Sequence, residues 1–274
     1  LPHTVGYVTN LSAELSLRAL TSLRAELNRR MAIMEGRAKD LAEMLEVAPD
    51  RAPPSLVIIV DEFATLVKEV PEFVEGVIDI AQRGRSLGIH LVLATQRPSG
   101  SVNENILANT NLRISLRMLD RAESTAIIDS PDAADIPVPL RGRGLARLGP
   151  RQLVEFQSAF AGAPVVSEEA HPPVLIGSFV GTDDSPQAIN RVVDAETEPT
   201  ETHLSVLIDA VVAANDQIGH PAPRRPWREV LPEVVTLDEV LDDPLACDGV
   251  IPGRHVAVGL IDAPERQDQH PGLV

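Results

Sequence analysis

The sequence predicts an α/β fold in which helices flank a parallel sheet. Two aliphatic runs, residues 56–60 and 89–94, have the length and composition of strands that are buried on both faces. A helical stripe of Phe73, Val77, Ile80 and Ala81 separates the two runs, and strand–helix alternation is typical of parallel sheets. Because 44% of the residues are hydrophobic but only 3% aromatic, we expect an aliphatic core.

Further elements are expected on both sides of these two strands. Leucines and methionines recur at helical spacing from a candidate N-cap at Ser12 to Gly36, which predicts a long helix. Residues 37–54 are polar and carry no such pattern. After the second strand we expect a helix at 103–109, a strand at 112–118, a helix at 122–128 capped by Asp120 and Glu123, and a hairpin to residue 160.

The second half of the chain has a different character. From residue 162 to 202 the periodicity is lost and Pro, Asp and Glu are frequent, as in a partly disordered linker. An amphipathic helix over 204–212, an extended proline tract at 223–227 and a strand at 255–261 follow. We therefore expect three parts, namely residues 1–161, 162–202 and 203–274. The first residue is leucine, and the late strand has no partners left in the chain to make a second full domain, so we interpret the sequence as a fragment.

The charge is unevenly distributed. Residues 1–160 hold 18 Lys+Arg against 20 Asp+Glu, whereas residues 161–274 hold 6 against 20, which gives the net charge of −16. Neither half shows the basic stripe expected of a duplex-DNA binder. The single cysteine, Cys247, excludes an intrachain disulfide, which suits a reducing compartment. No apolar run approaches the ~20 residues of a membrane span.

Two acids follow the first strand directly. Asp61 and Glu62 come after residues 56–60, and ligands of parallel sheets bind outside the carboxyl ends of the strands. The pattern fits a Walker B motif, in which the first acid helps to hold Mg²⁺. The second acid orients or deprotonates the water that attacks the γ-phosphate. The alternative is a plain strand end with two solvated acids.

These residues resemble a known family. Residues 56–63, followed by the segment His90-Leu-Val-Leu-Ala-Thr-Gln-Arg-Pro98, are similar to the FtsK/SpoIIIE family of ring-forming translocase ATPases. Residues 26–30, 109–118 and 142–144 continue the similarity. The EccC motors of type VII secretion are a finer match, on residues 1–3, 18–26, 130–134, 221–227 and 256–267.

The resemblance implies a fold, a reaction and a set of roles. It implies a RecA-like P-loop NTPase module over residues 1–161 with its N-terminal part missing, a linker, and the start of a second module at 203–274. Thr95 and Gln96 resemble a sensor that contacts the γ-phosphate or the water. Arg113 resembles an arginine finger that reaches into a neighbouring subunit, with Arg117 and Arg85 as alternatives. For each arginine, an ordinary surface ion pair is the competing interpretation.

One part of the family pattern is absent from the 274 residues. A Walker A loop, G-x-x-x-x-G-K-[ST], supplies backbone N–H groups and a lysine to the phosphates. The sequence has two lysines, Lys39 and Lys68, and neither follows a glycine. We therefore expect the isolated chain to bind ATP poorly and to be inactive, and the ATPase activity to belong to a longer parent protein.

Three functions stay open at this level. The resemblance implies a hexameric, ATP- and Mg²⁺-dependent motor at the cytoplasmic face of the cell membrane, which exports protein with membrane components of a type VII secretion complex. Small helical secreted substrates would bind through another module. The first alternative is a DNA translocase of the same superfamily, with DNA as partner. The second is a non-catalytic assembly or regulatory module without Walker A.

Overall fold

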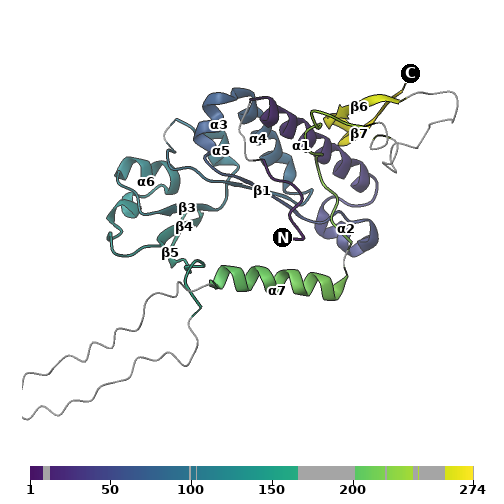
Figure 1. Ribbon diagram of the computed structural model, residues 1–274. Helices are drawn as coiled ribbons and strands as arrows, with labels where there is room; N and C mark the ends of the chain where they lie inside the picture. The colour runs from purple at the N-terminus through teal and green to yellow at the C-terminus, as the bar shows by residue number, and fades with distance from the viewer. Residues whose placement is uncertain are drawn as a thin grey trace, which may run out of the picture. The chain divides into compact units, whose positions relative to one another are not determined.

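The computed structural model describes residues 1–8, 13–98, 100–102, 104–165, 201–219, 221–236, 240 and 257–273 (Figure 1). They fall into two compact units, one of Thr4–Gln157 with Pro223–Val274 and one of Leu1–His3 with Ser158–Ala222. Among these residues no helix is both long and apolar enough to span a bilayer. The expected part boundaries at 161/162 and 202/203 stay predictions.

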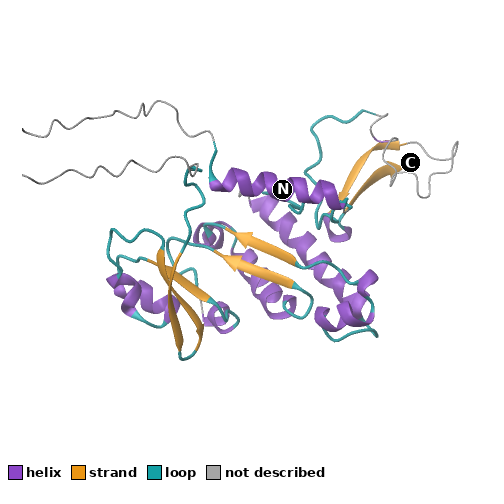
Figure 2. Ribbon diagram, turned by 90° about the horizontal axis from the view of Figure 1, so that it is seen from below, coloured by secondary structure: helices purple, strands orange, loops and turns teal. Residues whose placement is uncertain are grey.

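A pair of parallel strands lies at the centre of the larger unit. Strand β1 (Leu56–Val60) pairs with β2 (Ile89–Leu93) in the register Leu56↔Ile89 to Val60↔Leu93. Helices α3 (Phe63–Glu69) and α4 (Pro71–Gly84) connect the two strands, and the long helix α1 (Ala13–Met34) packs on α4 (Figure 2). The parallel α/β arrangement predicted from the sequence is confirmed. Ser12, the candidate N-cap, lies outside the described residues.

The main core lies on one face of this strand pair. Its buried residues come mainly from the helices and from the beginning of β2. They are Leu20, Leu23, Leu27, Met34, Met44, Phe63, Leu66, Val70, Phe73, Ile80, Leu87, Ile89 and Ile106. Leu56, Ile58 and Val60 pack against them, whereas Val57 and Ile59 are 57% and 71% exposed. The prediction that both strands are buried on both faces is therefore wrong, because the described helices cover one face only.

A short helix, α2 (Leu41–Val47), lies in the polar stretch for which no helix was predicted. The signal for it is local. Asp40 is the N-cap, and its carboxylate accepts a hydrogen bond from the Glu43 N–H at 2.8 Å. Leu41 and Met44 are buried, and a 3₁₀ turn, η1 (Pro49–Arg51), follows. Two apolar anchors are too few to stand out as a periodic stripe.

The third predicted strand belongs to a separate antiparallel sheet. After α5 (Glu104–Ala108), β3 (Arg113–Leu116) pairs with β4 (Arg143–Gly149), which pairs with β5 (Gln152–Gln157). Helix α6 (Arg121–Ile128) and η2 (Pro131–Asp135) pack here around the buried residues Ile128, Ala133, Ile136 and Leu145. Asp120 is the N-cap of α6, as predicted.

The smaller unit contains α7 (His203–Ile218), which begins at a Thr202–Ser205 capping box and ends at Gly219 in the left-handed region. Most of the predicted linker, residues 166–200, lies outside the described residues. In the larger unit, the C-terminal segment forms a hairpin of β6 (Ala257–Ala263), η3 (Pro264–Arg266) and β7 (Asp268–Leu273). The late strand expected at 255–261 is therefore the first strand of a hairpin.

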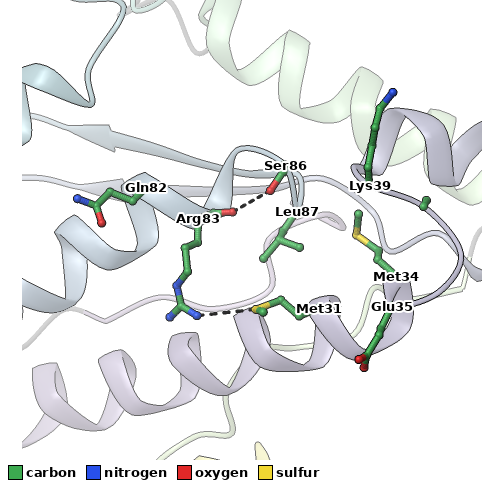
Figure 3. Close-up of a pocket in the computed structure, with 9 residues that line it drawn as sticks. Met31, Met34, Glu35, Lys39, Gln82, Arg83, Ser86 and Leu87 are labelled. Carbon is green, nitrogen blue, oxygen red and sulfur yellow. Dashed lines mark hydrogen bonds between the residues drawn. The ribbon is translucent and has the colours of Figure 1, made fainter.

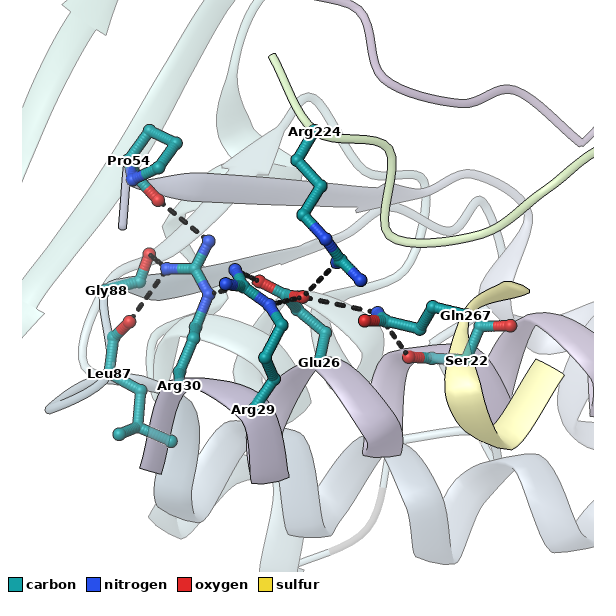
Figure 4. Close-up of polar contacts among 9 residues, drawn as sticks. All are labelled: Ser22, Glu26, Arg29, Arg30, Pro54, Leu87, Gly88, Arg224 and Gln267. Carbon is teal, nitrogen blue, oxygen red and sulfur yellow. Dashed lines mark hydrogen bonds and ion pairs between the residues drawn. The ribbon is translucent and has the colours of Figure 1, made fainter. Parts of the chain in front are cut away.

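A buried carboxylate on α1 connects three segments of the larger unit (Figure 4). Glu26 accepts hydrogen bonds from Arg29 at 2.7 and 2.8 Å, from Arg30 at 2.8 Å, from Arg224 at 3.1 Å and from Gln267 at 3.2 Å. We call these five residues the Glu26 cluster. Burial raises the pKa of Glu26, but the hydrogen bonds from Arg29 and Arg30 outweigh it and lower the pKa to about 2.

The Glu26 cluster also holds the beginnings of the two parallel strands. Arg30 is buried, and its guanidinium donates to the carbonyls of Leu87 at 2.8 Å and Pro54 at 2.7 Å. These carbonyls precede β2 and β1. Nearer the beginning of α1, Arg18 donates hydrogen bonds to both carboxylate oxygens of Asp262 at 2.6 and 2.8 Å. Helix α1 therefore holds the strand beginnings and the C-terminal hairpin together.

We predict that Glu26→Gln lowers the free energy of unfolding by ~3–5 kcal/mol, because it leaves the buried Arg30 without its counter-charge. Urea unfolding of the chain measures this, with the exposed Glu35→Gln as control.

The stability contributed by Glu26 should also depend on pH. A carboxylate whose pKa is lower in the folded state than in the unfolded state stabilises the folded state fully at a pH above its unfolded-state pKa. This contribution is lost as the pH falls toward the folded-state pKa. Wild-type stability should therefore fall between about pH 5 and pH 2, given the native pKa of about 2, and the variant should fall less. Equal slopes would contradict the assignment.

Candidate functional site

The hydrogen bonding between β1 and β2 continues beyond the carboxyl ends of both strands. The Ala94 N–H donates to the Val60 carbonyl at 2.8 Å, and the Phe63 N–H donates to the Ala94 carbonyl at 2.9 Å. These two bonds carry the pairing past both strand ends and turn the chain into α3. The residues that follow the strands, Asp61-Glu62 and Thr95-Gln96, are thereby placed side by side. We call this region the strand-end edge.

Glu62 has an unusual backbone conformation at the strand-end edge. Its φ of 51° and ψ of 41° lie in the left-handed region, which a non-glycine residue occupies at a cost of ~1–2 kcal/mol. The Glu62 N–H donates to Asp61 Oδ1 at 2.9 Å, and the Glu62 carbonyl accepts from Thr65 at 2.9 Å. The tight turn starts α3 immediately after the strand, so both acidic side chains stay at the edge.

The structure brings Glu62 and Gln96 into direct contact. The Gln96 Nε2 group donates to Glu62 Oε1 at 2.7 Å, across 34 residues of sequence. Thr95 is half-buried, and its Oγ1 accepts a hydrogen bond from the Arg97 N–H at 3.1 Å. Of the residues predicted for this edge, Glu62 and Gln96 touch each other, whereas Thr95 folds the loop that carries Gln96.

The side chains at this edge fit a magnesium–phosphate complex better than a metal held by protein alone. Among the described residues, no group of three or more His, Cys, Asp or Glu side chains is placed to hold a metal ion. Asp61 is exposed and accepts one backbone N–H, so its carboxylate keeps acceptor capacity. Mg²⁺ is usually bound through one or two carboxylates together with substrate phosphates and water. Asp61 is the residue that would hold it.

Arg113 lies elsewhere, at the end of α6. Its guanidinium donates to the Ile127 carbonyl at 3.1 Å and pairs with Asp129 at 2.9 Å, while its Nε is buried without a partner. Arg147 stands opposite Arg113 in the β3–β4 register and donates to the carbonyls of Ile128 and Asp129. Two arginines thus bind the negative end of one helix, with Asp129 between them.

This contact gives Arg113 a structural task within its own chain, and its action as a finger stays a prediction. Sequence patterns did not single out Arg147, because its role depends on a cross-strand neighbour that only the hairpin register defines. The alternatives Arg117 and Arg85 are both exposed. Arg117 follows β3 and Arg85 follows α4.

The larger unit also contains a groove that lies away from the strand-end edge. It has a volume of about 570 Å³ and lies between the ends of α1 and α4 (Figure 3). Its apolar floor contains Met31, Met34 and Leu87, with Lys39 and Arg83 at the rim. None of the predicted site residues lines this groove. At the strand-end edge, Asp61 and Gln96 are exposed and Glu62 is half-buried, so the edge presents acids and an amide to solvent.

The strand-end edge lies within a segment that matches a known family. Residues 41–100, which contain β1, β2 and the strand-end edge, match the FtsK/SpoIIIE family. The type VII secretion system protein EssC of Staphylococcus aureus is 35% identical over 99% of this chain and 19% of its own length. The ESX secretion system protein EccC of Geobacillus thermodenitrificans is 32% identical over 98% of this chain and 18% of its own length.

A solved structure agrees with the sequence comparisons. The cytoplasmic domain of the Thermomonospora curvata type VII secretion ATPase EccC superposes with a TM-score of 0.73 and 29% identity, covering 100% of this chain and 30% of that one. The resemblance predicted from the sequence, and with it the RecA-like P-loop fold, is confirmed. The chain spans about one fifth of the length of the curated relatives it matches.

Proposed function

We propose that this chain is part of an ATP-driven motor for protein export through a type VII secretion complex, because residues 41–100 match the FtsK/SpoIIIE family and nearly the whole chain is similar to EssC and EccC. The observation that carries the proposal is the strand-end edge, where a Walker B pair meets a glutamine from the neighbouring strand at 2.7 Å. The similarity to EssC and EccC extends over nearly the whole chain, which favours export of protein over transport of DNA.

Each side chain at the edge has a proposed task. Asp61 would hold Mg²⁺, which would neutralise phosphate charge when bound. Glu62 accepts a proton from, or orients, the water that attacks the γ-phosphate, and its left-handed backbone keeps the residue at the strand end. These 274 residues contain no Walker A loop, so we propose that a longer parent protein supplies the phosphate loop, that the chain alone binds ATP poorly, and that hydrolysis belongs to the full-length protein.

The assembly and the partners are proposed on the same basis. Residues 1–161 would be the larger part of one ATPase module, 162–202 a linker, and 203–274 the start of a second module. The full-length protein would form a ring, hexameric by family resemblance, at the cytoplasmic face of the membrane with other secretion components. Secreted substrates would bind at another module. A non-catalytic assembly module is the second candidate, favoured by the lack of a Walker A loop in this sequence.

We predict that Glu62→Gln in the full-length protein leaves nucleotide binding within ~3-fold of wild type but slows hydrolysis by ~10²–10⁴-fold, because general-base catalysis is lost while the phosphate contacts remain. Binding of a fluorescent ATP analogue and steady-state phosphate release measure the two effects. The exposed Glu69→Gln, at the end of α3, serves as the control. Hydrolysis at the wild-type rate in Glu62→Gln would exclude Glu62 from the mechanism.

We predict that Arg113→Ala subunits, inactive alone, regain part of their activity when mixed with Glu62→Gln subunits, because each variant then supplies what its neighbour lacks. Phosphate release from mixed full-length assemblies measures this. Arg147→Ala is the matched control, since Arg147 also binds the end of α6. This substitution should lower stability, and mixing it with Glu62→Gln should restore no activity. If the Arg113→Ala mixture stays as inactive as its components, the arginine does not act in a neighbouring subunit.

A further inference from the structure

The side-chain amide of Gln96 has two possible roles in a site of this kind. It can contact the nucleotide, or it can hold another residue of the site. In this structure its Nε2 donates to Glu62 Oε1 at 2.7 Å, at the short end of the usual range for an N–H···O bond. The acceptor is the carboxylate to which the general-base role is assigned, so the bond acts directly on the orientation of that carboxylate.

Glu62 needs such a partner because its backbone alone does not fix its carboxylate. The turn at Glu62 is set by main-chain bonds, but the side chain makes no capping hydrogen bond to α3. Three rotatable bonds separate the fixed Cα from the carboxylate. A general base must stand within hydrogen-bond reach of its water, and small displacements cost large factors in rate. Gln96 supplies the constraint from the neighbouring strand.

Thr95, the other residue of the sensor pair, has a different local task. Its hydroxyl accepts the Arg97 N–H at 3.1 Å, two residues further along, and so shapes the loop that follows β2. That loop carries Gln96 toward Glu62. Thr95 thus acts on the backbone, and Gln96 acts on the neighbouring strand end.

From this geometry we propose that Gln96 is a positioning residue, which holds the Glu62 carboxylate in place through its side-chain amide and does not read the γ-phosphate. The inference deepens the proposed ATPase function and rests on it. Glu62 touches the reacting water, and Gln96 acts through Glu62.

The first test replaces the amide with an apolar group of similar length in the full-length protein. Gln96→Met should lower kcat by ~10–100-fold, as expected for a misplaced catalytic group, with KM for ATP within about 3-fold. The affinities for ADP and for a non-hydrolysable ATP analogue should keep their wild-type ratio. Gln82→Met, on an exposed residue of α4, is the control and should match wild type.

Two results of this test would overturn the inference. If Gln96→Met leaves kcat unchanged, Glu62 does not depend on the amide. If the affinity for the ATP analogue falls while that for ADP stays constant, Gln96 contacts the γ-phosphate, as a nucleotide-reading sensor would.

The second test exchanges the two side chains. Gln96→Glu places two carboxylates at hydrogen-bond distance and should lower the melting temperature of the 274-residue chain. The double variant Glu62→Gln with Gln96→Glu restores an amide–carboxylate pair and should recover the melting temperature. In the full-length protein it should stay inactive, because the carboxylate is now on the other strand. Recovered hydrolysis, or no recovery of the melting temperature, would contradict the proposal.

Failure of the inference is distinguishable from failure of the proposed function. If wild-type full-length protein does not hydrolyse ATP, the proposed function falls and the inference falls with it. If wild type hydrolyses ATP and Glu62→Gln abolishes hydrolysis, but Gln96→Met behaves as Gln82→Met does, then only the inference falls.

Discussion

The parallel pairing of β1 with β2 is the constraint on which the rest of the larger unit depends. It begins with the Leu56 N–H donating to the Gly88 carbonyl at 2.9 Å and ends with the Phe63 N–H donating to the Ala94 carbonyl at 2.9 Å. The five residue pairs between these bonds fix the register. Because the strands run in the same direction, their polar successors meet at one edge. A shift of one strand by one residue would separate Glu62 from Gln96 and would turn the buried side chains of the shifted strand outward.

The beginnings of β1 and β2 are held by charged side chains. Arg30 binds the carbonyls that precede both strands, and Glu26 balances Arg30 while it also receives Arg224 and Gln267 from the C-terminal segment. A buried ion pair rarely adds net stability over apolar packing, but a broken one is costly. The Glu26 cluster therefore makes the position of the strands dependent on α1, and it makes α1 the common support of the strands and the C-terminal hairpin.

The sequence predicted the elements whose signal is local and periodic. The aliphatic runs at 56–60 and 89–94, the long first helix, the Asp120 cap and the Asp61–Glu62 pair were all recognisable, because each depends on neighbours within a few residues. The exposure of Val57 and Ile59 was not predicted, since it depends on which faces other segments cover. The same holds for the antiparallel partner of β3 and for the contact of Arg113 with α6, which arise from tertiary register. The Glu62–Gln96 bond lies between these cases, since both residues were predicted for the site but their bond was not.

We propose that ATP is hydrolysed at the strand-end edge. A structure of the full-length protein with Mg²⁺, ADP and aluminium fluoride, which mimics the transferred phosphoryl group, tests this proposal. We expect the metal to lie next to Asp61 and a water in line with the aluminium to lie within hydrogen-bond distance of Glu62, while Gln96 still donates to Glu62. A nucleotide bound elsewhere, with the strand-end edge facing only solvent, would contradict it.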